Sequence, residues 1–434
     1  MLLVLLVASA LAQGPTHLTV DEALARLEAN NPSLARAEAA SDGADAAQLA
    51  ALSGLLPTIT AVGNYTRNNA EVTLDLSQLT DVIAAITGQT PTDAPGVITL
   101  QPLDALTGTA SLKVPIINAP GWASVGAARQ AAEAADQSAL AQRSNLRGTA
   151  LSAFWLEAAA ESLVVAQQAS VERARTLLES AQRAEAAGTA THLGVLQAGT
   201  DLARREGDLI GATAGLEKAR LAVGALLGID GPVIVDMPAA ASASPAGDAD
   251  ALVAQALDER AEIAAAEAGL RAAQASLLAQ RLTWAPTLSG GFATFASSEP
   301  YPTGEKTGWK LTADLTWPIV TGGARLAATE KAGASVRDAE AALEAARLSV
   351  SQQVRGAIAD QSVAQARLDA ATHQRALAEE AAQIAQRSYD EGLVDQATVL
   401  DALDRLDLAR ASEIDATARL GVASSALSAA LGRW

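Results

Sequence analysis

Apolar residues recur every seven positions along two long stretches that contain no proline. The first series consists of Val195, Leu202, Leu209, Leu216 and Val223, and the second of Val399, Leu406, Leu420 and Leu427. In the second series Glu413 interrupts the repeat, and alanine stands three residues after each position. A strict seven-residue repeat keeps one seam of a helix against a partner and produces a left-handed coiled coil. Both stretches therefore predict long paired helices whose alanines allow close backbone approach.

A third stretch of this kind precedes the second series. Its seam residues are Val336, Leu343, Val350, Ala357, Ala364, Ala371, Ala378 and Ala385. The span from Gly323 to Glu391 is about 69 residues, which would measure roughly 100 Å at 1.5 Å per residue. A helix of that length predicts a long hairpin rather than an element of a globular domain.

Two shorter stretches alternate between apolar and polar residues, which is typical of strands with one apolar face. The apolar positions are Trp309, Leu311, Leu315 and Trp317 in WKLTADLTW, and Leu112 and Val114 in the first half. The two tryptophans would lie about 26 Å apart along a strand. Strand tilt brings that distance near the height of the apolar band between the aromatic girdles of an outer-membrane barrel. We predict that these side chains face lipid; an amphipathic hairpin packed on a soluble core is the alternative.

The two halves of the chain repeat the same order of elements. Pro57 and Pro286 occupy matching positions 229 residues apart, whereas Pro115 and Pro318 match at a spacing of 203. The first half therefore carries some 26 extra residues, in the loop between Asn69 and Thr107. Internal similarity at a fixed spacing indicates a duplicated supersecondary unit.

These patterns predict four segments. They are a signal peptide at 1–12, a first repeat at 13–228, a linker at 229–249 and a second repeat at 250–434. Each repeat should hold helices, a strand pair (about 57–118 and 286–320) and a long helical hairpin with its tip near 188–195 or 391–399. The signal peptide is predicted because an apolar run ends in the cleavage pattern Ala10-Leu11-Ala12, and the linker because Gly, Pro, Ala and Ser dominate it.

Membrane insertion of this chain would have to use strands. Beyond the N-terminal segment, no stretch approaches the ~20 apolar residues that a membrane-spanning helix needs. Four strands cannot close a membrane barrel, because lipid leaves the edge amides unpaired and the smallest closed barrels have about eight strands. Several chains are therefore expected to contribute strands to one barrel.

Composition excludes several function classes. The formal net charge of −18 argues against nucleic acid as a partner, because phosphates are bound by clustered Lys and Arg. The sequence has no cysteine, so no thiolate metal site or lipid-attachment cysteine is expected. His17, His192 and His373 are scattered without a second ligand at metal spacing, and no catalytic or phosphate-binding motif is present. We expect no metal, no cofactor and no enzyme activity.

Several motifs, in a duplicated order, resemble those of the TolC family of outer-membrane efflux proteins. They are LTVDEALARLEANNP near the start, GLLPTITAVGNYTR and WAPTLSGGF leading into strands, VPIINAPG and WPIVTGGAR leading out of them, and YDEGLVDQATVLDALDRL near the end. Each piece is weakly specific, but the ordered and duplicated set is strong and covers essentially all of the mature sequence.

The resemblance implies a mainly α fold with a small β part, in which duplicated coiled-coil hairpins accompany four membrane strands per chain. It implies a homotrimer with a β-barrel of 12 strands in the outer-membrane lipid, continued by an α-helical barrel across the periplasm. The implied function is the exit duct of a tripartite efflux or type I secretion system. Its partners would be a periplasmic adaptor (membrane fusion) protein and an inner-membrane transporter that supplies the energy. Efflux and secretion share this fold, so both remain open.

In this family the two hairpin tips contact the adaptor. The resemblance carries those contacts onto Gly188 and Thr189 in the first tip and onto Gly392 and Leu393 in the second. Both tips match the family's Val-Gly-Leu pattern only in part, since Glu391 stands in the valine place of the second tip. We therefore expect docking on an adaptor whose identity the sequence leaves open.

The family narrows its periplasmic mouth with aspartates three residues apart. Asp401 matches the later aspartate, and Thr398 occupies the place of the earlier one. A ring of Asp401 carboxylates would repel anions and concentrate cations at the constriction. A solvated charge on a helix face is the alternative interpretation of Asp401.

A periplasmic coiled-coil adaptor or scaffold is a second interpretation of the whole chain, because such proteins also have long helical hairpins. An adaptor should show one hairpin inserted into small β domains. Here the sequence predicts two hairpins, each preceded by an amphipathic strand pair, which favours the outer-membrane duct.

Overall fold

A computed structural model describes residues 16–77, 82, 85–86, 97–189, 191–237, 248–299 and 305–432. The predicted signal peptide at 1–12 lies outside these residues. The chain forms two compact units. The helical unit comprises residues up to 43, 133–268 and from 340 onward, and the strand unit comprises 44–132 and 269–339. The fold is mainly α with a small β part, as predicted.

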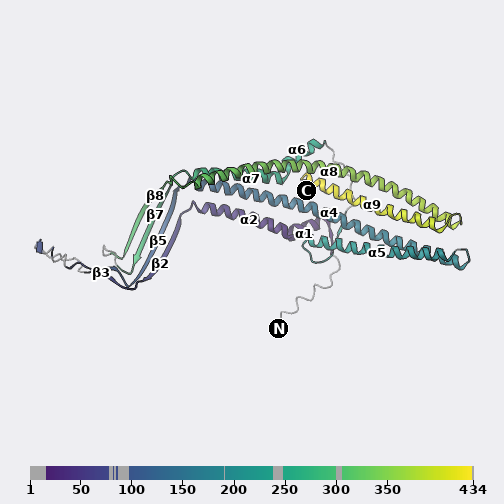
Figure 1. Cartoon of the computed structure of the whole chain (residues 1–434), viewed down its shortest axis with the longest axis horizontal. Helices are drawn as coiled ribbons and strands as arrows, with labels where there is room; N and C mark the ends of the chain where they lie inside the picture. The colour runs from purple at the N-terminus through teal and green to yellow at the C-terminus, as the bar shows by residue number, and fades with distance from the viewer. Residues whose placement is uncertain are drawn as a thin grey trace, which may run out of the picture. The chain divides into compact units, whose positions relative to one another are not determined.

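The helices form two long hairpins (Figure 1). Their bounds are α4 (Ala119–Ala186) with α5 (His192–Leu226), and α8 (Ala324–Asp390) with α9 (Gln396–Ala430). The shorter helices are α1 (Val20–Asn30), α2 (Pro32–Ser53), α6 (Ala249–Glu259) and α7 (Ala261–Leu282). With 68 and 67 residues, α4 and α8 each measure roughly 100 Å. The predicted length of the second hairpin is thus confirmed.

In the second hairpin the seven-residue seams are the buried faces of both helices, whereas in α5 only Leu216 and Val223 of the first series are buried. Along α9 the buried seam residues are Val399, Leu406, Ala409, Ala416, Leu420, Ala423, Leu427 and Ala430, and along α8 they include Leu343, Val350, Ala357, Ala364, Ala371 and Ala385. Glu413, which interrupts the apolar repeat of α9, forms an ion pair with Arg375 of α8 at 2.7 Å. A second ion pair, Arg410 of α9 with Glu379 of α8 at 3.0 Å, also crosses the seam. Small apolar residues and these charge pairs therefore hold the second hairpin together.

A small sheet in the helical unit includes four residues of the predicted linker at 229–249. Strand β6 (Val233–Asp236) lies inside that range and pairs in parallel with β1 (Thr16–Thr19). Val233 is fully buried in a core with residues of α1, α4 and α5. The flanking Gly-, Pro- and Ala-rich residues dominate the composition of the range and hide the short β-branched run Val-Ile-Val. The chain between the repeats is thus anchored where it enters the core.

The first helix, α1, begins at a capping box. The Thr19 hydroxyl accepts a hydrogen bond from the Glu22 amide, and the Glu22 carboxylate accepts one from the Thr19 amide at 2.9 Å. This capping box satisfies donors that helix geometry leaves unpaired, so it fixes the point at which the chain leaves β1 and enters α1.

One described helix, α4, is long and apolar enough in composition to cross a membrane. The sequence prediction that no such stretch exists was wrong on this criterion, because alanine contributes much of the apolar character of α4. Phe154 of this helix lies in the core described above, and Glu157 is fully buried against Arg220 of α5 at 3.2 Å. These contacts are typical of a helix packed against protein.

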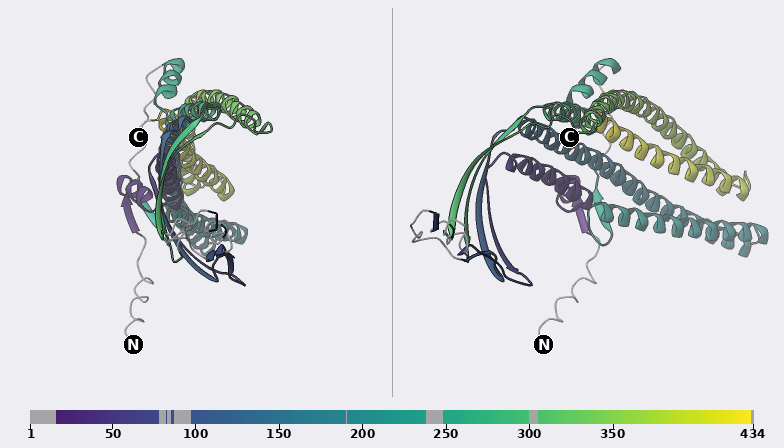
Figure 2. Two further views of the ribbon diagram at one scale, coloured as in Figure 1. Left: turned by 90° about the vertical axis from the view of Figure 1, so that its left-hand side faces the viewer. Right: turned by 60° about the vertical axis from the view of Figure 1, so that its left-hand side comes forward.

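The main sheet of the strand unit is antiparallel and has the strand order β2-β5-β7-β8. Its strands are β2 (Thr58–Arg67), β5 (Asp104–Ile117), β7 (Thr287–Ser297) and β8 (Thr307–Thr316), and they bend together in Figure 2. A separate hairpin of β3 (Val72–Asp75) and β4 (Val97–Gln101) falls in the extra segment of the first half. The central pairing, β5 with β7, joins the first repeat to the second.

One glycine marks a close approach between the two hairpins. A Cβ on Gly421 of α9 would collide with the indole ring of Trp155 on α4. Glycine costs roughly 1 kcal/mol relative to alanine inside a helix, so its presence here reflects the space that the indole needs.

We predict that Gly421→Ala lowers the stability of the fold although alanine is the better helix former. Overpacking costs about 1–3 kcal/mol and should exceed the gain in helix propensity. The control is Gly356→Ala in α8, where a Cβ meets nothing within 4 Å, and that variant should be neutral or stabilised. Thermal unfolding of the detergent-solubilised protein measures both, and equal Tm values for the two variants would contradict the prediction.

Candidate functional site

One face of the four-stranded sheet is apolar and exposed on the single chain. Strand register places Ile59, Leu112, Phe292 and Leu311 in one row across all four strands. Ile59 is 81% exposed and Leu311 is 74% exposed. A contiguous apolar surface of this kind marks contact with lipid or with another protein. The structure therefore brings the predicted strand residues Leu112 and Leu311 onto one surface.

The other predicted lipid-facing residues share that face or lie at its end. Register puts Val114, Trp309 and Leu315 on the same side as Leu311. Trp309 stacks on Phe292 with ring centroids 6.4 Å apart, while Trp317 follows the last residue of β8. Aromatic residues at both ends of the strands match the girdles of outer-membrane barrels.

The sequence reasoning missed Trp284, which completes the aromatic group beside Trp317. Trp317 Nε1 donates to the Trp284 carbonyl oxygen at 3.2 Å, and the Arg325 guanidinium lies 5.3 Å from the centre of the Trp284 ring. The motif WAPTLSGGF contains this tryptophan, but neither alternation nor the heptad repeat includes it. Its contact with residues 33 and 41 positions later depends on the tertiary fold.

The two hairpin tips have the same backbone conformation. Gly188 and Gly392 have φ of 76° and 75°, a left-handed conformation that glycine adopts without strain. At each tip the next amide donates to the carbonyl five residues back, Thr189 to Ala184 at 2.9 Å and Leu393 to Ser388 at 2.8 Å. Both tips are Schellman motifs. The two glycines therefore give both tips the same turn geometry, although the neighbouring side chains differ.

The tips differ in the side chains that they expose. Leu393 is 72% exposed, as an adaptor contact requires. The Thr189 hydroxyl instead donates to the Ala184 carbonyl oxygen at 3.0 Å. At this first tip the exposed apolar group is Leu193, at 63%, which the sequence reasoning missed; an apolar residue in the first turn of α5 was the available signal.

The starts of α5 and α9 lie side by side. A Cβ on Gly194 would approach the Gln396 side-chain oxygen to 2.6 Å, and Gln396 is buried. The structure thus brings the two predicted tips together into one composite surface within the helical unit. Gly194 is the residue whose small size permits it.

The two residues predicted at the mouth have separate partners. Thr398 belongs to the N-terminal cap of α9: its amide and hydroxyl bond the Asp395 carboxylate at 3.0 and 2.6 Å. Asp401 forms an ion pair with Arg405 at 2.9 Å, and both side chains are largely exposed. The predicted lone acidic charge therefore carries a compensating cation one helical turn away.

A buried charge network near the tips joins α4, α5 and α9. Arg205 of α5 is 4% exposed and donates to Asp201 at 2.7 Å, to Asp404 at 2.8 Å and to Asp407. It also donates to the Ser170 hydroxyl at 2.5 Å, which in turn donates to Asp407 at 2.8 Å. The carboxylates of α9 are thus held by an arginine of the other hairpin.

Two less buried arginines complete this network. Arg173 of α4 pairs with Asp407, and Arg204 pairs with Asp201 at 2.8 Å and with Asp404. The network therefore contains three arginines and three aspartates. A buried arginine with three carboxylate partners satisfies the condition under which a buried charge is tolerated.

The sequence reasoning missed this network because its members are not duplicated. At the repeat spacing, Arg205 corresponds to Ala409 and Asp407 corresponds to Ala203. The available signal was the adjacent pair Arg204-Arg205 beside a helical seam, together with aspartates three residues apart on the partner helix. The network therefore depends on positions at which the two repeats differ in sequence.

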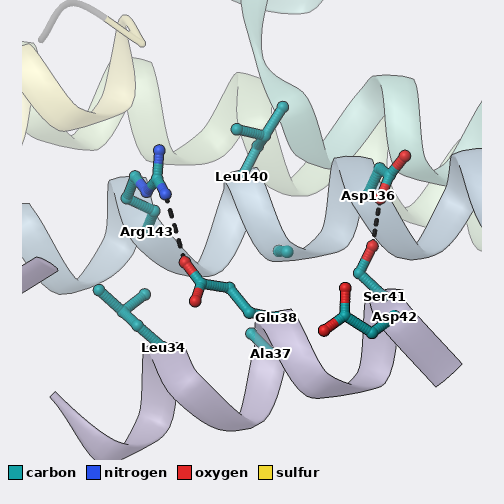
Figure 3. Close-up of a pocket in the computed structure, with 9 residues that line it drawn as sticks. Leu34, Ala37, Glu38, Ser41, Asp42, Asp136, Leu140 and Arg143 are labelled. Atoms are coloured by element: carbon teal, nitrogen blue, oxygen red, sulfur yellow. Dashed lines mark hydrogen bonds and ion pairs between the residues drawn. The ribbon is translucent and has the colours of Figure 1, made fainter. Parts of the chain in front are cut away.

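One groove of the helical unit is crossed by paired polar side chains. Figure 3 shows a groove between α2 and α4 that is crossed by the ion pair Glu38–Arg143 at 3.5 Å and by a Ser41–Asp136 hydrogen bond. These side chains partner one another across two helices. Across the described ranges, no group of three His, Asp or Glu side chains converges as a metal site requires.

A known protein family matches both repeats of the chain. The family model described as Outer membrane efflux protein matches residues 23–229 and 252–433. The two matched ranges cover most of the chain and fall on its two repeats. No curated protein sequence matches the chain.

Solved outer-membrane channels share the fold. CusC superimposes with a TM-score of 0.80 at 18% identity, covering 98% of this chain and 96% of that chain. VceC of Vibrio cholerae gives 0.77 at 19% identity, with coverage of 95% and 96%. The open state of MtrE of Neisseria gonorrhoeae gives 0.77 at 20% identity, with coverage of 95% and 89%. At these identities the likeness establishes the fold.

We predict that Arg205→Ala destabilises the helical unit much more than Arg204→Ala. Removing Arg205 deletes the buried cation that joins Asp201, Asp404 and Asp407 and leaves each of them with one less buried arginine. Breaking a buried ion pair costs about 3–5 kcal/mol. Arg204 has two of the same partners but is half exposed, where such pairs contribute about 0–1 kcal/mol. Urea unfolding of the solubilised protein compares the two variants, and equal losses would show that burial of Arg205 is unimportant.

We predict that the second tip loosens in acid. Hydrogen bonds from the Thr398 hydroxyl and amide lower the pKa of Asp395 below its ordinary 3.8. Because the folded pKa is lowered, the cap is fully present above the unfolded value and is lost as the pH falls through the folded value. The protection factor of the Thr398 amide should fall in that range. Asp395→Asn, whose cap does not titrate, should show no such fall.

Proposed function

The chain belongs to the outer membrane efflux protein family, and we propose that three copies of it close into the exit duct of a tripartite transport system. As a member of this family the chain is an outer-membrane exit channel whose helical portion lies in the periplasm. What we add is the trimeric assembly, its partners and the residues that serve them.

The apolar face of the sheet carries the proposal for the assembly. Strands β2 and β8 are the edges of the described sheet, and lipid offers no hydrogen bonds to edge amides. Closing the sheet requires strands from other chains, and three copies of four strands give a barrel of 12. The apolar row would then face lipid and the opposite, polar face would line the lumen.

The composite tip surface supports docking on a periplasmic adaptor. Leu193 and Leu393 are exposed apolar side chains on two rigid turns, and exposed apolar anchors on ordered backbone are typical of protein interfaces. We assign adaptor contact to these leucines and to the backbone at Gly188, Thr189 and Gly392. An inner-membrane transporter would then supply the energy and load the duct.

We assign Asp401 to the lining of the periplasmic mouth, where it forms an ion pair with Arg405. Thr398 contributes through the cap of α9 rather than as a lining group. Small-molecule efflux and type I secretion both use such a duct, and no observation on this chain favours one of them. The apolar-faced sheet disfavours a periplasmic scaffold, for which that face would have no cover.

We predict that Leu311→Lys abolishes assembly in the outer membrane, whereas Thr312→Lys is tolerated. Leu311 faces the proposed lipid side, where a lysine near the bilayer centre costs about 2–4 kcal/mol per chain. Thr312 is the next residue of β8 and points to the polar face, so it is a matched control. Membrane fractionation, the oligomer on semi-native gels and conductance in planar bilayers report the result. Equal behaviour of both variants, or absence of conductance from the unmodified protein, would refute the duct.

A further inference from the structure

The polar face of the sheet carries two lysines on neighbouring rows. One row contains Thr58, Lys113, Gly291 and Thr312, and the next contains Thr60, Ser111, Ala293 and Lys310. Both lysines are exposed on the single chain. The residues beside them are small or hydroxylated, so the ammonium groups are the dominant charges on this surface.

Neither ammonium group is neutralised. The acid that shares the polar face within the four strands is Asp314, and it accepts a hydrogen bond from the Thr312 hydroxyl at 3.1 Å. Throughout the described residues, no carboxylate lies within ion-pair distance of Lys113 or Lys310, whereas Arg67 and Asp104, on the opposite face, pair with each other at 3.5 Å. The polar face is therefore net positive in a chain whose formal net charge is −18.

Lysine is used selectively in this chain. Five of the 31 basic residues are lysines, and three of them, Lys113, Lys306 and Lys310, lie in or beside these strands. The cation of the ion pairs in the described helices is arginine, apart from a His192–Glu185 contact. Arginine suits fixed, two-pronged pairing, whereas lysine presents a hydrated point charge on a flexible stem. The strands thus carry the kind of cation that attracts anions without holding them rigidly.

The proposed periplasmic mouth has no uncompensated charge at Asp401 that would repel anions. Asp401 is compensated by Arg405 at 2.9 Å, so a ring of three such pairs has no net charge. The expected repulsion of anions at the constriction is accordingly weakened. Two independent observations, at the strands and at the mouth, point in the same direction.

We propose that the duct passes anionic cargo, namely small organic anions that carry carboxylate, phosphate or sulfonate groups. The proposal rests on the trimeric duct of the preceding section, in which the polar face lines the lumen. Six lysines would then surround the path at the strands. Attraction at several weak sites raises the local concentration of an anion and still allows it to leave.

The test uses the purified assembly in planar bilayers with potassium chloride at different concentrations on the two sides. We expect the unmodified duct to be more permeable to chloride than to potassium. The Lys113→Gln and Lys310→Gln double variant should shift the reversal potential toward potassium. Lys218→Gln with Lys331→Gln removes the same charge from α5 and α8 and should leave the reversal potential unchanged.

A second probe uses citrate, a small organic anion, on the side where the strand hairpins end. Citrate should bind in the lumen and reduce the conductance of the unmodified duct in a voltage-dependent way. In the double variant the block should weaken on the order of tenfold, and in the control pair it should persist. Arg405→Gln should independently favour potassium, because it leaves Asp401 uncompensated at the mouth.

The outcomes separate this proposal from the one on which it rests. A conducting duct that prefers potassium and whose citrate block survives the Lys113 and Lys310 changes would overturn the assignment of anionic cargo and leave the duct intact. A shift of equal size in the Lys218 and Lys331 pair would attribute the preference to overall charge and also overturn it. Absence of conductance from every variant would instead overturn the duct itself.

Discussion

The unpaired edges of an apolar-faced sheet are the constraint on which the rest of the structure depends. Strands β2 and β8 end the sheet, and their outer backbone groups need partners wherever water is excluded. A soluble domain could cover such edges with loops or charged side chains. Here Ile59 and Leu311 continue the apolar surface across both edge strands, so association of sheets is the physical solution. The duplication explains why one chain supplies two hairpins, joined by β5 with β7.

The helices meet a different requirement, which is to stay long without a thick core. Alanines and single aliphatic residues along the seams bring the backbones of α8 and α9 close together, and close approach compensates for the shortage of large side chains. The seams do not need large aromatic side chains. Trp284, Trp309 and Trp317 all lie in the strand unit. The one tryptophan described in the helical unit, Trp155, fits because Gly421 leaves room.

Periodicity predicted the elements because it reflects local geometry that tertiary contacts reinforce. The seams, the alternation around Trp309 and the glycines at 188 and 392 each depend on residues close in the sequence. The missed features depend on distant contacts. β6 is three buried residues whose partner lies more than 200 positions earlier, and Arg205 meets Asp404 and Asp407 only after the two hairpins pack. The pairing of Asp401 with Arg405 is local, but a family pattern that emphasises the acid directs attention away from its neighbour.

The unduplicated charge network has a consequence for how this chain finds its fold. Two halves with similar seams could exchange partners, since the apolar heptads of α5 and α9 are nearly interchangeable. In such an exchange Arg205 would take the place of Ala409, and Asp407 that of Ala203. A buried arginine would then lose both acids of α9 and keep only Asp201 of its own helix, which destabilises the exchanged arrangement. The network thus favours the native arrangement over the one in which α5 and α9 exchange places. Each of these two similar helices can therefore occupy only one position in the fold.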